Sequence, residues 1–160
     1  MRILVSFVLL VATTAAFGAS DSLSLSLFID RALSASREAV DLTLVLHNTS
    51  TQALIINRRL AYPGPDLMLE IMDPQGVRLR WLPPAPPPSL TRSDFVRLDP
   101  GEEFHLKLPD IGRQLFDKLE EGSEYRVRAV YRNDEPGSQW HYAAWTGSLE
   151  SRPITFRWGG

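Results

Sequence analysis

The chain has 160 residues, of which 44% are hydrophobic and 22% charged, with a formal net charge of −2 at pH 7 and no cysteine. This composition excludes cysteine catalysis, disulfides and a lipid anchor on cysteine. Acidic and basic residues are interleaved, so the basic surface that a nucleic-acid partner requires is missing and we expect no nucleic acid.

The N-terminal segment differs in composition from the rest of the chain. Arg2 is followed by an apolar stretch, residues 3–12, and then by small residues up to Ala19. This order is typical of a secretory signal peptide, and the stretch is shorter than the roughly 20 residues that cross a bilayer. The alternatives are an uncleaved anchor or a first buried strand. We predict a signal peptide at 1–19 and one domain at 20–160, periplasmic or secreted, with no integral membrane segment after cleavage.

From Leu23 onward, apolar and polar residues alternate in one short segment after another, which is the pattern of strands that bury one face. The first such segments are Leu23–Leu27 and Val40–His47. A third, Ala53–Asn57, follows the polar residues Asn48–Thr51, which suit a tight turn. Asn48-Thr49-Ser50 is also formally a glycosylation acceptor, so two roles are open for Asn48.

The middle of the chain contains the clearest hairpin. Residues Leu67–Met72 and Val77–Trp81 alternate on either side of Asp73-Pro74-Gln75-Gly76, a typical turn sequence. Five of the six residues in Pro83–Pro88 are prolines, which cannot donate hydrogen bonds to a strand ladder. We predict that this proline run is an exposed loop or a crossover at an edge.

The last third continues the alternation. Phe95–Leu98 and Phe104–Leu108 are expected to form a strand pair around the turn Asp99–Glu102, and residues 110–120 carry the only helical spacing. Later strands are expected at Tyr125–Arg132, Trp140–Ala144 and Ile154–Trp158. Eight or nine short strands predict an all-β fold, an antiparallel immunoglobulin-like β-sandwich with one short crossover helix at about 110–120.

One motif resembles a corner of immunoglobulin-like domains. Gly122–Val127 matches the approach to strand F, where a tyrosine, here Tyr125, bonds back to the backbone. Val127 stands where an antibody domain would carry a disulfide cysteine, so apolar packing takes its place.

More broadly, residues 40–132 resemble the bacterial immunoglobulin-like family typified by the intracellular proteinase inhibitor domain of BsuPI type. The matching pieces are, in order, Leu42–Ser50, Gly64–Asp73, Val77–Trp81, Leu98–Glu102 and Gly122–Ala129. The resemblance implies the sandwich fold and supplies no catalytic residues.

No group of residues has the spacing of a reaction centre. No serine lies in a Gly-x-Ser-x-Gly elbow, and the three histidines, His47, His105 and His141, fall at outward positions of different strands. Carboxylate pairs such as Glu102-Glu103 flank turns. We therefore expect no enzyme, no cofactor and no metal.

The aromatic residues and the proline run are the candidates for a contact surface. Trp81 and Trp158 are expected in the core, whereas Trp140, Tyr142 and Trp145 suit the core and a binding surface equally. A stiff proline loop suits docking into an aromatic groove or a protease cleft, but also a plain crossover. The candidate contact residues are Pro83, Pro84, Pro86, Pro87, Pro88, Trp140, Tyr142 and Trp145.

The leading hypothesis is an exported, non-enzymatic protein-interaction module with a partner in the cell envelope or outside the cell. One alternative is a proteinase inhibitor that acts through an exposed loop. Another is a carbohydrate-binding module that uses Trp140, Tyr142 and Trp145.

Overall fold

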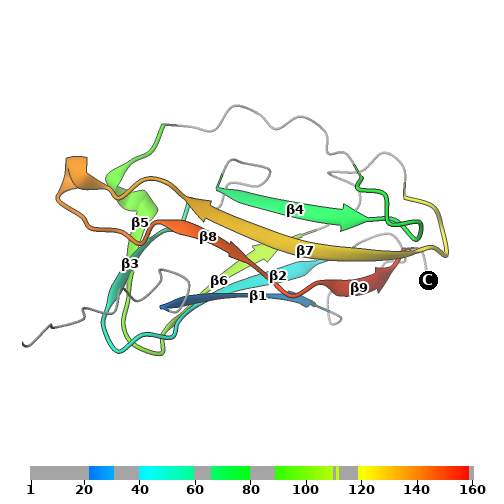
Figure 1. Ribbon diagram of the computed structural model, residues 1–160, viewed down its shortest axis with the longest axis horizontal. Helices are drawn as coiled ribbons and strands as arrows, with labels where there is room; N and C mark the ends of the chain where they lie inside the picture. Colours follow the sequence, from blue (N-terminus) through cyan, green and yellow to red (C-terminus); the bar gives the residue numbers. More distant parts are fainter. Residues whose placement is uncertain are drawn as a thin grey trace, which may run out of the picture.

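The computed structural model describes residues 22–30, 40–59, 66–79, 89–109, 111 and 119–158. The predicted signal peptide, Trp81 and the proline run Pro83–Pro88 lie outside these residues, as does most of the helix predicted at 110–120. The regular elements of the described part are nine strands and two short 3-10 helices, joined by turns and loops (Figure 1).

The strands form antiparallel sheets in two layers. In chain order they are β1 (Leu23–Ile29), β2 (Leu42–Asn48), β3 (Leu54–Asn57), β4 (Leu67–Met72), β5 (Phe95–Leu98), β6 (Glu103–Leu108), β7 (Glu124–Asn133), β8 (Gly147–Glu150) and β9 (Ile154–Arg157). One sheet has the order β1-β2-β6, and the other has β4-β7-β8 with β9 also paired to β7. With the separate β3–β5 pair set aside, this is the A-B-E against C-F-G order of an immunoglobulin-like sandwich. The all-β prediction is confirmed.

The core lies between the two sheets and follows the alternation in the sequence. Leu23, Leu25 and Leu27 of β1 are buried, whereas the residues between them face outward. On the opposite sheet, β7 buries every second residue from Tyr125 to Tyr131. These side chains belong to one hydrophobic cluster. Since the chain has no cysteine, this packing and the strand ladders hold the fold.

Two local predictions around turns are confirmed. Asp73 closes the hairpin after β4, because its carbonyl accepts the N–H of Gly76 at 3.0 Å and its Oδ1 accepts the N–H of Val77 at 2.7 Å. The returning segment pairs with β4 as far as Leu79, whose N–H donates to the Ile71 carbonyl. At the other corner, the Tyr125 hydroxyl accepts the backbone N–H of Glu120 at 2.8 Å, as the resemblance to strand F implies.

The predicted strand pair of Phe95–Leu98 with Phe104–Leu108 is wrong. β5 pairs with β3, and β6 pairs with β2, so the chain leaves one ladder and enters another at residues 99–102. The segment from β2 to β3 makes the same change across residues 49–53. Two bent segments therefore run antiparallel to each other, and their bends coincide.

Asn48 holds the two bends together. Its fully buried side chain donates from Nδ2 to the carbonyls of Gln52 at 2.8 Å and Leu98 at 3.0 Å. Its Oδ1 accepts the backbone N–H of Ser50 at 3.0 Å and the Ser50 hydroxyl at 2.7 Å. Of the two roles left open by the sequence, the folded chain uses Asn48 as a turn residue, with every polar group of the amide engaged inside the protein.

Candidate functional site

Two loops meet at one end of the sandwich. One is the loop of residues 134–146 between β7 and β8, which contains the 3-10 helix η3 (Ser138–Trp140); the other contains η2 (Arg92–Asp94), just before β5 (Figure 1). The backbone N–H of Trp145 donates to the Ile55 carbonyl of β3 at 2.7 Å. This contact anchors the first loop to the β3–β5 pair.

Three side chains from the two loops, together with the first residue of β5, form a surface that we call the aromatic shelf: Arg92, Trp140, Tyr142 and Phe95. Phe95 is buried beneath, and its ring centroid lies 5.4 Å from that of Trp140 and 5.5 Å from that of Tyr142. Trp140 and Tyr142 are half-exposed, and their rings are tilted by 52° and 51° against Phe95. The shelf therefore combines two partly exposed aromatic rings with an apolar floor.

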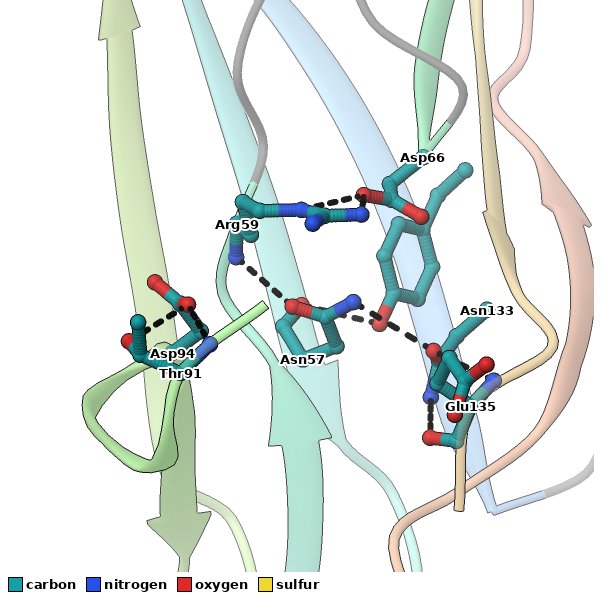
Figure 2. A network of polar contacts seen from close by, with 8 residues as sticks. Asn57, Arg59, Asp66, Thr91, Asp94, Asn133 and Glu135 are labelled. Atoms are coloured by element: carbon teal, nitrogen blue, oxygen red, sulfur yellow. Dashed lines mark hydrogen bonds and ion pairs between the residues drawn. The ribbon is translucent and has the colours of Figure 1, made fainter. Parts of the chain in front are cut away.

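A cation completes the shelf. The exposed Arg92 guanidinium lies 5.9 Å from the centroid of the Tyr142 ring, and its Nε donates to the Tyr142 hydroxyl at 3.1 Å. The hydrogen bond to Tyr142 raises the pKa of Arg92, so the group stays charged at every ordinary pH. The backbone N–H and hydroxyl of Thr91 both donate to the Asp94 carboxylate at 2.7 Å, which fixes the ends of η2 (Figure 2).

Left-handed backbone conformations give the 134–146 loop its shape. Gly137 has φ 73° and His141 has φ 62°, and His141 is the one described residue other than glycine with positive φ. A Cβ at Gly137 would lie 3.1 Å from the Phe95 ring and from Tyr142 Cβ, so only glycine allows this close approach. The strand expected at Trp140–Ala144 is wrong for this reason, and His141 lies in a turn instead of on a strand.

Two buried asparagines fix the loop to the sandwich (Figure 2). The Nδ2 of Asn133 donates to the carbonyls of Trp145 at 2.5 Å and Glu135 at 3.1 Å, and its Oδ1 accepts the Glu135 N–H at 3.1 Å. A longer contact of 3.4 Å joins Asn57 Nδ2 to Asn133 Oδ1. One side chain at the end of β7 therefore holds both the start and the end of the loop.

Tyr131 extends this network, and so does Arg59, which Figure 2 shows beside Asp66. The fully buried Tyr131 hydroxyl donates to the Asn57 carbonyl at 3.0 Å, and burial raises the pKa of this phenol. The Arg59 N–H donates to Asn57 Oδ1 at 2.9 Å, and its guanidinium pairs with Asp66 at 2.9 Å. We call this hydrogen-bonded group, which comprises Asn57, Arg59, Asp66, Tyr131 and Asn133, the polar frame. Because its buried polar groups have partners, the polar frame holds the loop that carries the shelf in one conformation.

The sequence alone did not decide whether Trp140, Tyr142 and Trp145 lie in the core or on the surface, and the structure assigns each of them. Trp140 and Tyr142 belong to the shelf. Trp145 is 7% exposed and its ring stacks on Tyr131 at 5.7 Å and 20°, so of the two roles that the sequence left open it takes the core position. Trp158 is partly buried against the core, as expected. The candidate prolines lie outside the described residues.

Arg92 and Phe95 are shelf residues that the sequence reasoning missed. They lie more than 40 positions before Trp140 in the chain, and no motif links the two segments. The signal that could have found them is the pairing of β5 with β3, because that pairing brings η2 next to the loop anchored on β3.

A second surface feature lies on the outer face of the β1-β2-β6 sheet. It is an open hollow of about 410 Å³, with the hydroxyls of Ser24, Ser26 and Thr43 among its lining. His47 and His105, on the neighbouring strands β2 and β6, also line it, and His105 Nε2 lies 2.9 Å from a Glu103 oxygen. Within the described ranges, no group of three or more His, Asp or Glu side chains could hold a metal ion.

The fold and site thus define an all-β antiparallel sandwich with an aromatic surface at one end. No protein-family model matches the sequence, and no curated protein matches it. In the described part of the chain, we find no helix with the length and apolar composition needed to cross a membrane.

Three solved structures contain regions with a similar chain path. One is Bacteroides uniformis beta-glucuronidase 2 covalently bound to cyclophellitol-6-carboxylate aziridine, with 16% sequence identity and a TM-score of 0.39. Another is Bacteroides uniformis beta-glucuronidase, with 16% identity and a TM-score of 0.38. Each of these two matches covers 84% of this chain and 13% of the other chain. The third is beta-glucosidase 3B from Thermotoga neapolitana in complex with glucose, at 18% identity and TM-score 0.34, with 86% of this chain and 17% of that chain covered. The chain spans less than a fifth of each, and a likeness of this degree bears on neither ligand nor activity.

Proposed function

We propose that this chain is an exported, non-enzymatic interaction module that binds a protein of the cell envelope or the extracellular space through the aromatic shelf. Export rests on the apolar N-terminal stretch, which has the order of a signal peptide. The binding role rests on the composition, exposure and rigidity of the shelf.

The observation that carries the proposal is the partial exposure of Trp140 and Tyr142 beside the exposed Arg92. Trp, Tyr and Arg are the residue types that most often dominate the energy of protein interfaces. Large aromatic rings that are partly exposed on a folded surface can act as anchors for a partner. The frame around Asn57 and Asn133 orders the shelf in advance, which lowers the entropy cost of binding.

Carbohydrate binding by the same rings is the second candidate. The structure reduces the proposed platform from three rings to two, because Trp145 is buried. What favours this candidate is the partly exposed ring of Trp140, because sugars commonly stack on indole rings. A glycan array probed with the purified chain distinguishes the candidates, since a protein-binding module gives no saturable glycan signal.

The test of the main proposal compares a shelf variant with a matched control. The shelf variant carries Trp140→Ala and Tyr142→Ala; the control, Phe28→Ala, removes another aromatic ring, 54% exposed, from β1. A partner is isolated from cell-envelope extract with the wild-type chain, purified, and titrated against all three proteins by calorimetry. We expect the shelf variant to bind at least about 30-fold more weakly, the loss of one interface hot spot, and the control to bind like the wild type. Equal binding by all three proteins would refute the proposal.

A further inference from the structure

Strand β1 lies at one edge of its sheet, beside β2 (Figure 1). Just before β1, the Ser22 carbonyl accepts the N–H of Thr49 at 3.0 Å. Hydrogen-bonded residues alternate along an antiparallel ladder, so the even-numbered residues of β1 bond to β2. The backbone N–H and C=O groups of Leu25 and Leu27 therefore point to the other side, where no described strand pairs with β1.

β1 lacks the features that usually prevent an edge strand from pairing with another chain. Proteins guard such edges with charged side chains, prolines, bulges or short strands. β1 has seven residues, LSLSLFI, with no charge and no proline, and it pairs with β2 residue for residue without a bulge. The other described edge strands of the two main sheets all carry charged residues: Glu70 in β4, Glu103 and Lys107 in β6, Glu150 in β8 and Arg157 in β9. Among these edges, β1 is therefore the one suited to accept a further strand.

The residue pattern of β1 is complementary to itself. In an antiparallel pair with a two-fold axis at Ser26, Leu25 lies opposite Leu27 of the second copy. These two residues have outward-pointing backbone groups, so each of the two symmetric pairs gains two hydrogen bonds. Their side chains lie on the buried face, so the apolar layer continues across the axis. On the outer face, Ser24 lies opposite Phe28, whose ring is 54% exposed and gains a neighbour.

We propose that two copies of this chain pair through β1 about a two-fold axis at Ser26, which joins their β1-β2-β6 sheets into one continuous sheet. A strand without charge cannot select a partner strand of opposite charge, so recognition depends on the alternation of apolar and small polar residues, which a second β1 supplies. The outer edges of the joined sheet are then the two β6 strands, which Glu103 and Lys107 guard, so the assembly closes at two copies. The pairing uses no residue of the aromatic shelf and goes beyond the proposed function.

Charges placed at Ser26 test the pairing in solution. Ser26 is exposed, and on the axis it faces its own copy as a non-hydrogen-bonded pair, in which side chains are closest. By sedimentation velocity over a range of concentrations, we expect a dimer for the wild type. Ser26→Lys and Ser26→Glu should each associate at least about fivefold more weakly, because like charges then lie opposite each other. An equal mixture of the two variants pairs lysine with glutamate and should dimerise at least as tightly as the wild type.

The matched control is His105→Lys. His105 lies in the same row of the outer face as Ser26, through Val45 on the strand between them, so the control adds the same charge two strands away from the axis. It should dimerise like the wild type. The recovery of association in the mixture shows that both Ser26 variants are folded.

Introduced cysteines test the register, because the chain has no cysteine of its own. An axis at Ser26 brings position 26 of both copies within disulfide distance, so Ser26→Cys should cross-link with itself under mild oxidation. Ser24→Cys should not cross-link with itself, but it should cross-link with Phe28→Cys in a mixture, since these positions lie opposite each other. An axis shifted to Leu25 would instead link Ser24→Cys to Ser26→Cys.

A monomeric wild type, or a dimer that both Ser26 charge variants leave unchanged, would overturn pairing through β1. A dimeric wild type in which Ser26→Cys does not cross-link with itself would overturn the axis at Ser26. The test of the proposed function is independent of these results, because Ser26→Lys keeps the whole shelf and should bind the envelope partner like the wild type. If the dimer forms as expected while the shelf variant binds that partner normally, the shelf proposal fails and the β1 pairing stands.

Discussion

Replacing Asn133 tests whether one buried amide holds the loop that carries the shelf. The side chain is fully buried and makes three hydrogen bonds of 3.1 Å or less, all to the backbone of Glu135 and Trp145. Asn133→Ala removes all three. A net contribution of about 1 kcal/mol for each bond predicts a loss of about 3 kcal/mol in the free energy of unfolding, and more where a carbonyl is left without a donor.

Asn133→Asp is the sharper variant, because it keeps the shape of the side chain and removes the NH₂ group. An ionised carboxylate cannot donate, and it would face the carbonyls of Glu135 and Trp145 inside the protein. We expect a loss of at least about 4 kcal/mol at pH 7. The buried carboxylate would keep the donors of Glu135 and Asn57 at its Oδ1, but no cation faces it and its other oxygen would lie against two carbonyls, which costs more than a lost hydrogen bond.

The effect of Asn133→Asp should depend on pH, with a definite sign. Burial and the two carbonyls disfavour the ionised form, so the pKa of the introduced carboxyl in the folded state rises above its unfolded value of about 3.9. The unfolded state then releases its proton more readily, and folding is penalised increasingly as the pH rises above 3.9. The gap to the wild type should therefore narrow from pH 7 to pH 4, where the neutral carboxyl can donate to a carbonyl.

Urea unfolding at pH 4 and pH 7 measures both variants. The alanine variant serves as the control, since its gap to the wild type contains no titrating group at position 133 and should be the same at both pH values. An aspartate variant that loses less than about 1 kcal/mol at pH 7, or whose gap does not change with pH, would refute this account of the frame.

Three further predictions concern the bend, the buried phenol and the loop. Asn48→Ala should lower the free energy of unfolding in urea by about 4 kcal/mol, because it removes four hydrogen bonds. Ser50→Ala removes one of these bonds and two exposed bonds with Gln52, so it should cost only about 1–2 kcal/mol. Because burial raises the pKa of Tyr131, this phenol ionises at lower pH in the unfolded state than in the folded state, so the melting temperature should decline above about pH 10. Tyr131→Phe should make the decline of the melting temperature between about pH 9 and 11 shallower than in the wild type. The same decline in both proteins would contradict this. Gly137→Ala should cost about 1–2 kcal/mol, since it places a side chain at φ 73° against Phe95, and it should change Trp140 emission; an unchanged melt and spectrum would show that the loop adapts freely.

The features that could be predicted from the sequence are those fixed by neighbouring residues. Strands β1, β2, β4 and β7 alternate clearly because each buries one face, and alternation is a local property. The turn at Asp73–Gly76 and the corner at Tyr125 also depend on a few adjacent residues. These elements were expected within a residue or two of where they lie.

The pairing of β5 could not be predicted in this way. A turn such as Asp99–Glu102 normally joins two partners, and here the chain instead changes ladder at that turn. The change depends on the coincident bend at Asn48, whose amide bonds to Leu98, 50 positions away. Period-two alternation gives the face of a strand but not the identity of its neighbour.

The site was predicted in part, for the same reason. Trp140 and Trp145 are both large aromatics in one segment, and local composition does not distinguish them. What separates them is the turn formed by Gly137 and His141, which leaves Trp140 outside, and the anchoring of Trp145 to Ile55 and Tyr131, which takes it inside.

The shelf is built from segments that are far apart in the chain, and this has a consequence for when it forms during folding. The contact between Asn57 and Asn133 spans 76 positions and the bond from Arg92 to Tyr142 spans 50, so both form only after long-range closure of the chain. Contacts of such sequence separation form slowly, because a long loop must close first. A partner that binds the shelf would therefore bind the folded protein and not its folding intermediates. Because such a partner binds only the folded state, it would also stabilise that state against unfolding by mass action.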